Sequence, residues 1–183
     1  MPIPQQVKSG DFISARVRAE QGFGLVELLA AMMVLMVGIL ALFAMFESGI
    51  RTIKRASTVT TAGALADREM ENIRAIRYDS IGLPETLVVA AASPYSSDSA
   101  YQASAANRVG LNACGTAPCT TSVPVQTLTG ADGKSYRVDT YMTWQTITGG
   151  RAVKLVTIVV RDGSSTTKVW ARTASSFDAS TGE

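Results

Sequence analysis

The chain has 183 residues, and its 17 Lys plus Arg against 15 Asp plus Glu leave a net charge of only +2. The basic footprint that nucleic-acid binding needs is therefore missing. There is no histidine, which removes the commonest general base and metal ligand. We expect no nucleic-acid partner, no metal or other cofactor, and no enzymatic activity, and the length favours one modest domain plus a membrane segment.

A long apolar run follows a polar leader, residues 1–22. Leu28 to Phe46 comprises 19 residues without a charge or an amide side chain, and as a helix they span roughly 28 Å, close to the ~30 Å hydrocarbon core of a bilayer. A cleaved secretory signal has only about 7 to 15 apolar residues. Leu42-Phe43-Ala44 also puts Leu where its cleavage site needs Ala. We predict that residues 23–46 span a membrane instead.

The helical pattern continues beyond the apolar run. Small or apolar residues recur every three or four positions from Ile50 to Ile76, which is typical of an amphipathic helix. Gly and Pro end the pattern at Ile81-Gly82-Leu83-Pro84. We expect one helix from Phe23 to Tyr78, with an exposed amphipathic half within residues 47–81.

Basic residues flank the apolar run equally on its two sides, three on each: Lys8, Arg16 and Arg18, and Arg51, Lys54 and Arg55. The positive-inside rule therefore does not decide the orientation. The second cluster is read as solvated or facing lipid headgroups, with a subunit contact as the lesser alternative. The Ser/Thr-rich composition and a close Cys pair favour an exported domain.

Residues 82–133 are low in periodicity and rich in Ala, Ser, Thr, Pro and Gly, which predicts a long surface connection with short extended pieces at Glu85 to Ala90 and Val123 to Leu128. Cys114 and Cys119 lie within it. In an exported domain we expect them to close a small disulfide loop contributing roughly 2 kcal/mol. Two free thiols in a reducing cytoplasm are the alternative, and two cysteines without histidine cannot form a structural zinc site.

Residues 134–175 show a period of two, typical of strands. Three strands are predicted, joined by turns at Gly149-Gly150 and Asp162-Gly163: Ser135 to Ile147, Val153 to Arg161 and Thr166 to Thr173. The first places two sets of side chains on opposite faces: Tyr136, Val138, Met142 and Trp144, and Arg137, Asp139 and Thr143. Trp144 and Trp170 are expected in the core or on the sheet face rather than as ligand platforms.

The predicted fold class is α+β, a long N-terminal helix with a membrane-spanning first half, packed on a C-terminal antiparallel β-meander of about three to four strands. The apolar face of such a meander needs a cover, and the helix stripe is the available partner. Residues 176–183 form a tail.

The segment Gly22-Phe23-Gly24-Leu25-Val26-Glu27 resembles the type III signal of type IV pilins and type II secretion pseudopilins. The resemblance implies that a prepilin peptidase cuts between Gly22 and Phe23 and methylates the new amino terminus of Phe23. It also implies that the leader stays cytoplasmic and that the C-terminal domain is exported from the inner membrane. Gly24 departs from the family pattern, which usually has Thr.

Two further stretches carry the resemblance. Met33 to Leu42 is similar to the membrane run of PilV-type minor pilins, and Ala66 to Ile76 resembles the helix end shared by pseudopilins and those minor pilins. The family implies a structural subunit of a filament, with other pilin subunits as partners and membrane lipid around the helix before assembly. A minor pilin in an extracellular pilus is preferred over a periplasmic type II secretion pseudopilin and a major pilin.

Glu27 is an acid at the edge of an apolar run, where a carboxylate is costly, about 2.5 to 3.5 kcal/mol at the bilayer centre and less near an interface. After cleavage, the amine of Phe23 would lie at a similar depth, and a charge-assisted pair with Glu27 of a neighbouring subunit would relieve that cost. The family resemblance implies this pairing, with Phe23 and Glu27 guiding subunit assembly.

Other functions remain as alternatives. A bitopic membrane anchor with an exported β-rich domain would make Glu27 merely interfacial and Gly22 incidental. A dinucleotide site at Gly22-x-Gly24 lacks a preceding strand and the third glycine. An exported enzyme is the third class, but a Ser/Lys pair such as Lys134 and Ser135 occurs in any domain of this composition and signals nothing without geometry.

Overall fold

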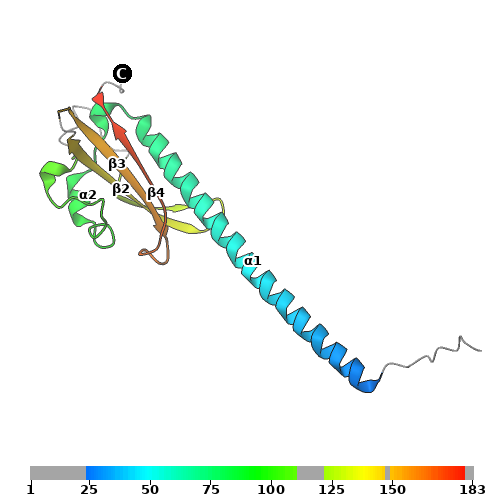
Figure 1. The fold of residues 1–183 in the computed structure, drawn as a ribbon. Coiled ribbons are helices and arrows are strands. Elements are labelled where there is room, and N and C mark those ends of the chain that lie inside the picture. Colours follow the sequence, from blue (N-terminus) through cyan, green and yellow to red (C-terminus); the bar gives the residue numbers. More distant parts are fainter. Residues whose placement is uncertain (1–23, 111–121, 147–148, 180–183) are drawn as a thin grey trace, which may run out of the picture. The chain divides into compact units, whose positions relative to one another are not determined.

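Helix α1 is the longest element of the chain. The computed structural model describes residues 24–110, 122–146 and 149–179 and divides into two compact units that meet between Gly49 and Ile50. Within these residues α1 runs from Leu25 to Arg74. Its first turn is closed by the Gly24 carbonyl, which accepts hydrogen bonds from the Glu27 and Leu28 N–H groups at 2.9 and 3.1 Å. The expected long helix is thus confirmed over its described length (Figure 1).

The four strands form one antiparallel sheet in chain order, a meander: β1 (Val125–Thr129), β2 (Ser135–Thr146), β3 (Ala152–Asp162) and β4 (Val169–Phe177). The meander starts before and ends after the predicted residues 134–175. Strand β4 begins three residues later than predicted because Lys168 still belongs to the turn, where its N–H binds the Ser165 carbonyl and its carbonyl accepts from the Asp162 N–H. The α+β fold class is confirmed.

The second half of α1 packs on one face of the sheet. Its buried side chains recur at helical spacing: Thr58, Ala62, Leu65, Ala66, Met70 and Ile73. Strand β2 meets them through Tyr136 and Val138, which are 1% and 0% exposed. At Gly130, in the β1–β2 turn, an added Cβ would lie 2.6 Å from Thr61 Cγ2, so only glycine lets the turn approach the helix this closely. The predicted cover for the apolar sheet face is therefore correct.

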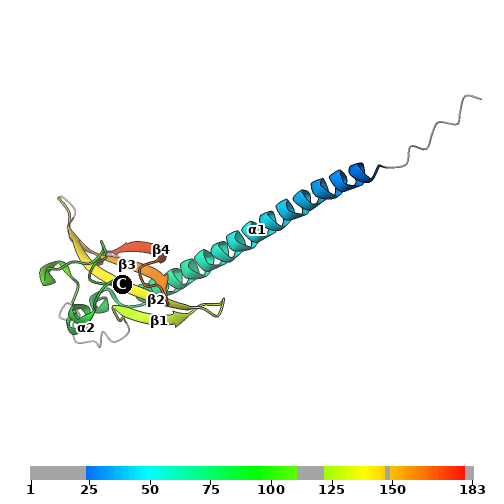
Figure 2. The ribbon, with the colours of Figure 1, turned by 90° about the horizontal axis from the view of Figure 1, so that it is seen from below.

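The short helix η1 (Tyr78–Ser80) follows α1, and the opposite sheet face is covered by the next residues, 83–110 (Figure 2). This covering segment contains the short helices α2 (Glu85–Ala90) and η2 (Ala105–Asn107). Four of its side chains are at most 3% exposed: Leu83, Val88, Tyr95 and Val109. The Tyr95 ring stacks on that of Tyr141 from β2 at 4.4 Å, and the Tyr95 hydroxyl donates to the Thr140 carbonyl at 2.8 Å.

Two predictions for this segment were wrong. Residues 83–110 are not a surface connection, because their apolar side chains complete the core. Glu85–Ala90 is helical rather than extended: Pro84 precedes the first turn, where a missing N–H costs nothing, and Glu85 suits the positive helix start. The extended piece expected at Val123 to Leu128 is confirmed approximately, as β1.

Candidate functional site

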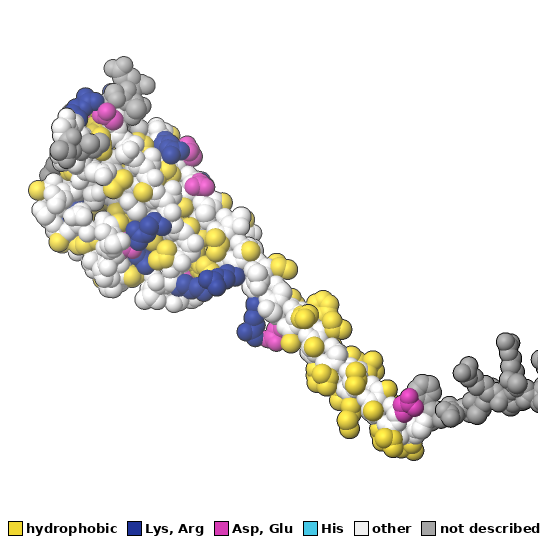
Figure 3. Space-filling model, in the orientation of Figure 1, with side chains coloured by type: hydrophobic (Ala, Val, Ile, Leu, Met, Phe, Trp, Pro, Cys, Tyr) yellow, Lys and Arg dark blue, Asp and Glu magenta, His cyan; other side chains and the backbone are white. Residues whose placement is uncertain are grey.

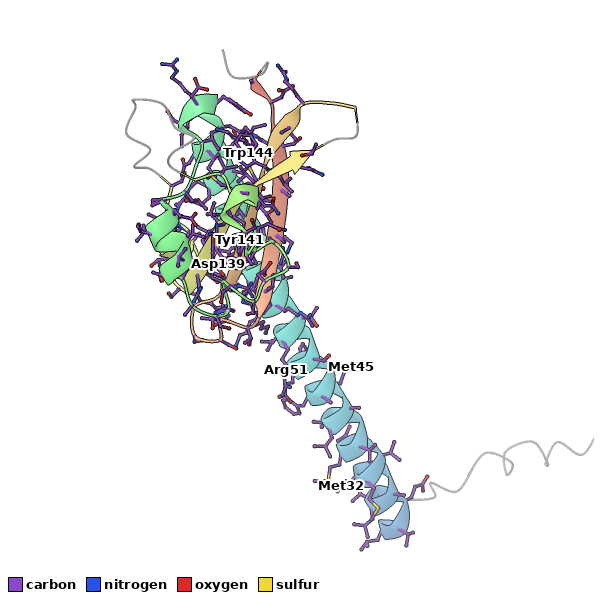
Figure 4. All side chains as sticks on the ribbon, turned by 90° about the vertical axis from the view of Figure 1, so that its left-hand side faces the viewer. Met32, Met45, Arg51, Asp139, Tyr141 and Trp144 are labelled. Atoms are coloured by element: carbon purple, nitrogen blue, oxygen red, sulfur yellow. The ribbon has the colours of Figure 1, made fainter. Side chains whose placement is uncertain are left out.

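The first half of α1 has an apolar surface on all sides. Every residue from Gly24 to Gly49 is exposed, and large hydrophobic side chains cover this stretch (Figure 3). Met32 and Met45 illustrate it, with exposed fractions of 60% and 72% (Figure 4). A helix that is apolar all round requires lipid or other helices as its surroundings. Among the described residues α1 is the one helix long and apolar enough to cross a membrane.

Glu27 lies in the first turn of α1, where the helix dipole favours a negative charge. Its carboxylate makes no hydrogen bond or ion pair with another residue of the described ranges. The next charged side chain along the helix is Glu47, twenty positions later, or about 30 Å at helical rise. Glu27 is thus an acid at one end of an otherwise uncharged stretch of α1 that is long enough to span a membrane, and its carboxylate is available to an external cation.

The other residues predicted for this site lie outside the described residues. Gly22 and Phe23, the expected cleavage and methylation positions, directly precede the first described residue, Gly24. Cys114 and Cys119 fall within 111–121, so the expected disulfide stays a prediction. Within the described ranges, no group of three or more Asp, Glu, Cys or His side chains is placed to hold a metal ion.

A buried ionic network on the sheet face opposite α1 was not anticipated from the sequence. Asp139 from β2 accepts hydrogen bonds from Arg161 Nε and Arg137 Nε, both at 2.8 Å. Arg161 also pairs with Asp98 of the covering segment, and Arg172 from β4 donates to both Asp98 oxygens at 2.8 Å. The side chains of Asp139, Asp98 and Arg161 are at most 5% exposed. The network therefore fastens the covering segment to three strands.

The pKa values of Asp98 and Arg161 are shifted toward the ionised forms. Burial alone would raise the pKa of Asp98, but the Ala100 N–H and the Arg172 guanidinium outweigh it, and the net shift is downward. Burial would likewise lower the pKa of Arg161, yet its hydrogen bond to Asp139 makes the net shift upward. Such mutual stabilisation is typical of a structural clamp.

Two further cations hold backbone that follows α1, Arg108 in the covering segment and Lys154 at η1. Arg108 donates to the Gln102 carbonyl at 2.7 Å and to the Ala103 carbonyl at 2.9 Å, and it pairs with Glu85 of α2. Lys154 is only 1% exposed and donates to the Tyr78 and Ile81 carbonyls at 2.6 and 2.9 Å. Burial lowers the pKa of Lys154. Both side chains satisfy backbone carbonyls, which is a structural role.

Both tryptophans are half-buried and pack against the core, as expected. Trp144 lies 5.7 Å from Lys154 Nζ, and Trp170 donates from Nε1 to Asp162 at 3.2 Å. Lys134, considered for a Ser/Lys pair, donates instead to Thr58 Oγ1 of α1 at 2.7 Å.

A cleft of about 330 Å³ opens between the end of α1, η1 and the end of β4. Its lining includes Tyr78, Phe177, Arg74 and Asp178. Arg74 pairs with Glu71 at 2.5 Å, and Asp178 pairs with Arg151 at 2.8 Å. The charges of this cleft are therefore engaged within the domain.

The site that stands out is the apolar half of α1 with Glu27 in its first turn, since it has no cover within the described chain. Comparison with protein-family models, with curated proteins and with solved structures found no match.

Proposed function

We propose that the chain is a structural subunit of a type IV pilus-like filament, a minor pilin that is made as a membrane precursor. One observation carries the proposal. The first half of α1 is apolar on every side and has a single acid in its first turn, and that turn closely follows Gly22-Phe23 in the sequence. Prepilin peptidase would cut the chain between Gly22 and Phe23, and Phe23 would become the methylated amino terminus.

The surface of the helix suits a subunit that exchanges one apolar environment for another. Leu25 to Phe46 offers side chains that pack as well against lipid tails as against neighbouring helices. Apolar contacts alone would not fix the register between subunits. A carboxylate in an apolar setting must pair with a cation, because an unpaired charge there is costly. That pairing would fix the register between subunits.

The exposed domain has the properties of a filament surface unit. Its buried side-chain polar atoms all have partners among the described residues, so its fold does not depend on the apolar helix half for hydrogen bonding. Assembly through Phe23 and Glu27 would leave this domain outward, available for contacts with its surroundings.

The mature amino terminus tests the proposal directly. We expect mass spectrometry of the membrane fraction to find a chain that begins with N-methyl-Phe23. Gly22→Leu should leave the leader attached. Gly24→Thr, which puts the usual family residue just after Phe23, should be processed normally. A full-length chain that begins at Met1 or Pro2 in the membrane would reject the proposal in favour of a bitopic anchor.

Glu27 has a separate test. Glu27→Ala should leave cleavage intact but abolish incorporation into filaments, because the Phe23 amine loses its partner charge. Glu47→Ala, an acid at the other end of the apolar run, is the matched control and should be incorporated. Normal incorporation of the Glu27 variant would contradict the assigned role.

A deletion strain separates the two kinds of filament. Loss of surface pili is expected for a minor pilin, whereas loss of a secreted enzyme with pili intact would identify a type II secretion pseudopilin.

A further inference from the structure

Basic side chains gather on α1 where its apolar stretch ends (Figure 3). Lys54 and Arg55 follow Phe46 by eight and nine positions, or roughly 12 to 14 Å along the helix. Both are exposed, and neither side chain is hydrogen-bonded or ion-paired to another residue that the structure describes. In a membrane-spanning helix, these positions lie just beyond the headgroup layer, and long basic side chains can reach back into it.

Two turns of the sheet add lysines at the same place. Lys134 of the β1–β2 turn donates to Thr58 Oγ1, and Thr58 itself donates to the Lys54 carbonyl at 2.9 Å, one helical turn away. The β3–β4 turn adjoins it, since the Gly163 N–H binds the Ser135 carbonyl at 3.1 Å. That turn ends with Lys168, which is exposed. We call these three segments, Ile50 to Ala64, Gly130 to Ser135 and Asp162 to Lys168, the basic end.

The basic end is strongly asymmetric in charge. It contains five Lys or Arg and two Asp, with no Glu. Both acids are engaged locally. Asp132 accepts from the Tyr136 hydroxyl at 2.7 Å and pairs with Lys134 at 3.4 Å, and Asp162 accepts from the Ser164 hydroxyl and N–H at 2.7 and 3.0 Å. By contrast, residues Asp67 to Asp79, which include the C-terminal end of α1 and η1, have four acids and three arginines. Of these two regions, only the one next to the apolar run has an excess of positive charge.

We infer that the basic end is a docking surface for anionic phospholipid headgroups, which holds the domain against the membrane before the subunit enters a filament. Charge complementarity carries the inference, because each Lys or Arg near an anionic membrane surface strengthens binding about fivefold. The inference rests on the proposed membrane-inserted precursor, and it adds a lipid partner for the domain itself.

The two tryptophans provide matched probes in the full chain. Trp170 lies at the basic end, 3.8 Å from Lys168 Nζ. Strand pairing through Val160 places Val138 level with Ala171, the neighbour of Trp170. Trp144 is six residues beyond Val138 on β2, or about 20 Å farther along the sheet. Trp144→Phe leaves only Trp170 to emit, and Trp170→Phe leaves only Trp144. Each chain is reconstituted into phosphatidylcholine vesicles that contain a headgroup nitroxide quencher, with or without about a third of phosphatidylglycerol.

We expect phosphatidylglycerol to increase quenching of Trp170 but not of Trp144, and high salt to reverse it because headgroup contacts are screened. Lys54→Gln with Arg55→Gln should weaken the docking equilibrium about 25-fold. The matched control is Arg74→Gln with Arg77→Gln, two exposed positions, one at the C-terminal end of α1 and one just after it, which should change nothing.

The outcomes separate the two proposals. If the chain stays in the vesicles on flotation but quenching of Trp170 does not change with phosphatidylglycerol, the proposed lipid docking is refuted and the filament proposal stands. If quenching does not change with phosphatidylglycerol and the Lys54/Arg55 variant loses filament incorporation, the basic end is a subunit contact, which also refutes lipid docking. A chain that does not stay in vesicles would overturn both.

Discussion

The two units of the chain satisfy their surfaces in opposite ways. Up to Gly49, the described residues are exposed and almost entirely apolar, and they bury no side chain. From Ile50 onward, even charged side chains are buried, as Asp139 is, and each buried side-chain polar atom has a partner among the described residues. One unit needs an external cover, and the other supplies its own.

This difference predicts which property of the protein a substitution in each unit should change. A change in the apolar unit should alter insertion or assembly while the domain unfolds as before. A change in the domain core should lower the free energy of unfolding without affecting insertion. Variants matched in residue type between the two units test whether the separation is real.

The largest loss of stability is expected from Asp139→Ala. The substitution removes one of the two acids that pair with buried Arg161, the one at 2.8 Å, and leaves it Asp98. Breaking a buried pair costs up to about 3 to 5 kcal/mol. Urea unfolding in detergent, followed by tyrosine and tryptophan fluorescence, measures the loss.

Arg151→Ala is the control for that measurement, since its pair with Asp178 is exposed and should contribute less than about 1 kcal/mol. If Asp139→Ala does not fold, Asp139→Asn keeps the shape and one acceptor oxygen, and it should lose less. Equal unfolding midpoints for Asp139→Ala and Arg151→Ala would contradict a stabilising network.

Met70→Ala and Met36→Ala compare one residue type on the two halves of one helix. Met70 is 3% exposed and Met36 is 68% exposed. Removing a buried methionine side chain costs about 2 to 5 kcal/mol, so Met70→Ala should lower the urea midpoint of the domain. Met36→Ala should leave that midpoint unchanged, and a comparable decrease would show that the two units are not independent.

Much of this arrangement follows from local sequence patterns. The uncharged run from Leu28 to Phe46 and the stripe that follows it fix the two halves of α1, because a helix repeats its contacts every three or four residues. Alternation in β2 and β3, with Gly149 and Gly163 in the turns, predicts the meander. The acid at Glu27 was recognisable because nothing else near it is charged.

The covering segment was missed because its contacts are distant in the chain. Asp98 and Arg161 are 63 positions apart, and no local pattern links them. Asp139 occupies the polar-looking face of β2, which alternation alone assigns to solvent. One signal was present: β3 is apolar on both faces toward its end, which indicates a second cover. Tyr95 and Val109 of the covering segment are side chains that supply this second cover.

A charge in the middle of the apolar unit should affect insertion alone. Leu35→Arg replaces a favourable residue by an unfavourable one and should cost about 3 kcal/mol of insertion free energy. The carbonate-resistant membrane fraction measures this effect. Ala64→Arg, an exposed position on the packed half of the same helix, should remain fully inserted. Equal extraction of the two variants would deny that the first half spans a membrane.

The smallest effect is a pH dependence confined to the domain. Three carboxyl groups have lowered pKa values in the folded state, those of Asp98, Asp132 and Asp162. At Asp132 the hydrogen bond from the Tyr136 hydroxyl is the main lowering cause, followed by the Lys134 N–H, and together they outweigh burial. At Asp98 the Ala100 N–H and Arg172 overcome the opposing effect of burial, and at Asp162 the Ser164 hydroxyl is the main cause, followed by the Ser164 and Ser165 N–H groups. The unfolded chain therefore binds more protons than the folded chain as the pH falls below about 4.

Their contribution to the free energy of unfolding is complete above the unfolded pKa and is lost as the pH falls through the lower folded values. Urea midpoints measured from pH 6 to pH 2 should decrease most steeply below pH 4. Asp98→Asn should make that decrease shallower, because one of the three linked protons is removed, whereas Asp67→Asn, on the exposed side of α1, should keep the parent slope. Insertion of the apolar unit into vesicles should not vary over the same range through any of these groups. If Asp98→Asn instead kept the parent slope, the carboxylate would not be held ionised by its neighbours, and the ionic clamp would have to rest on Asp139 alone.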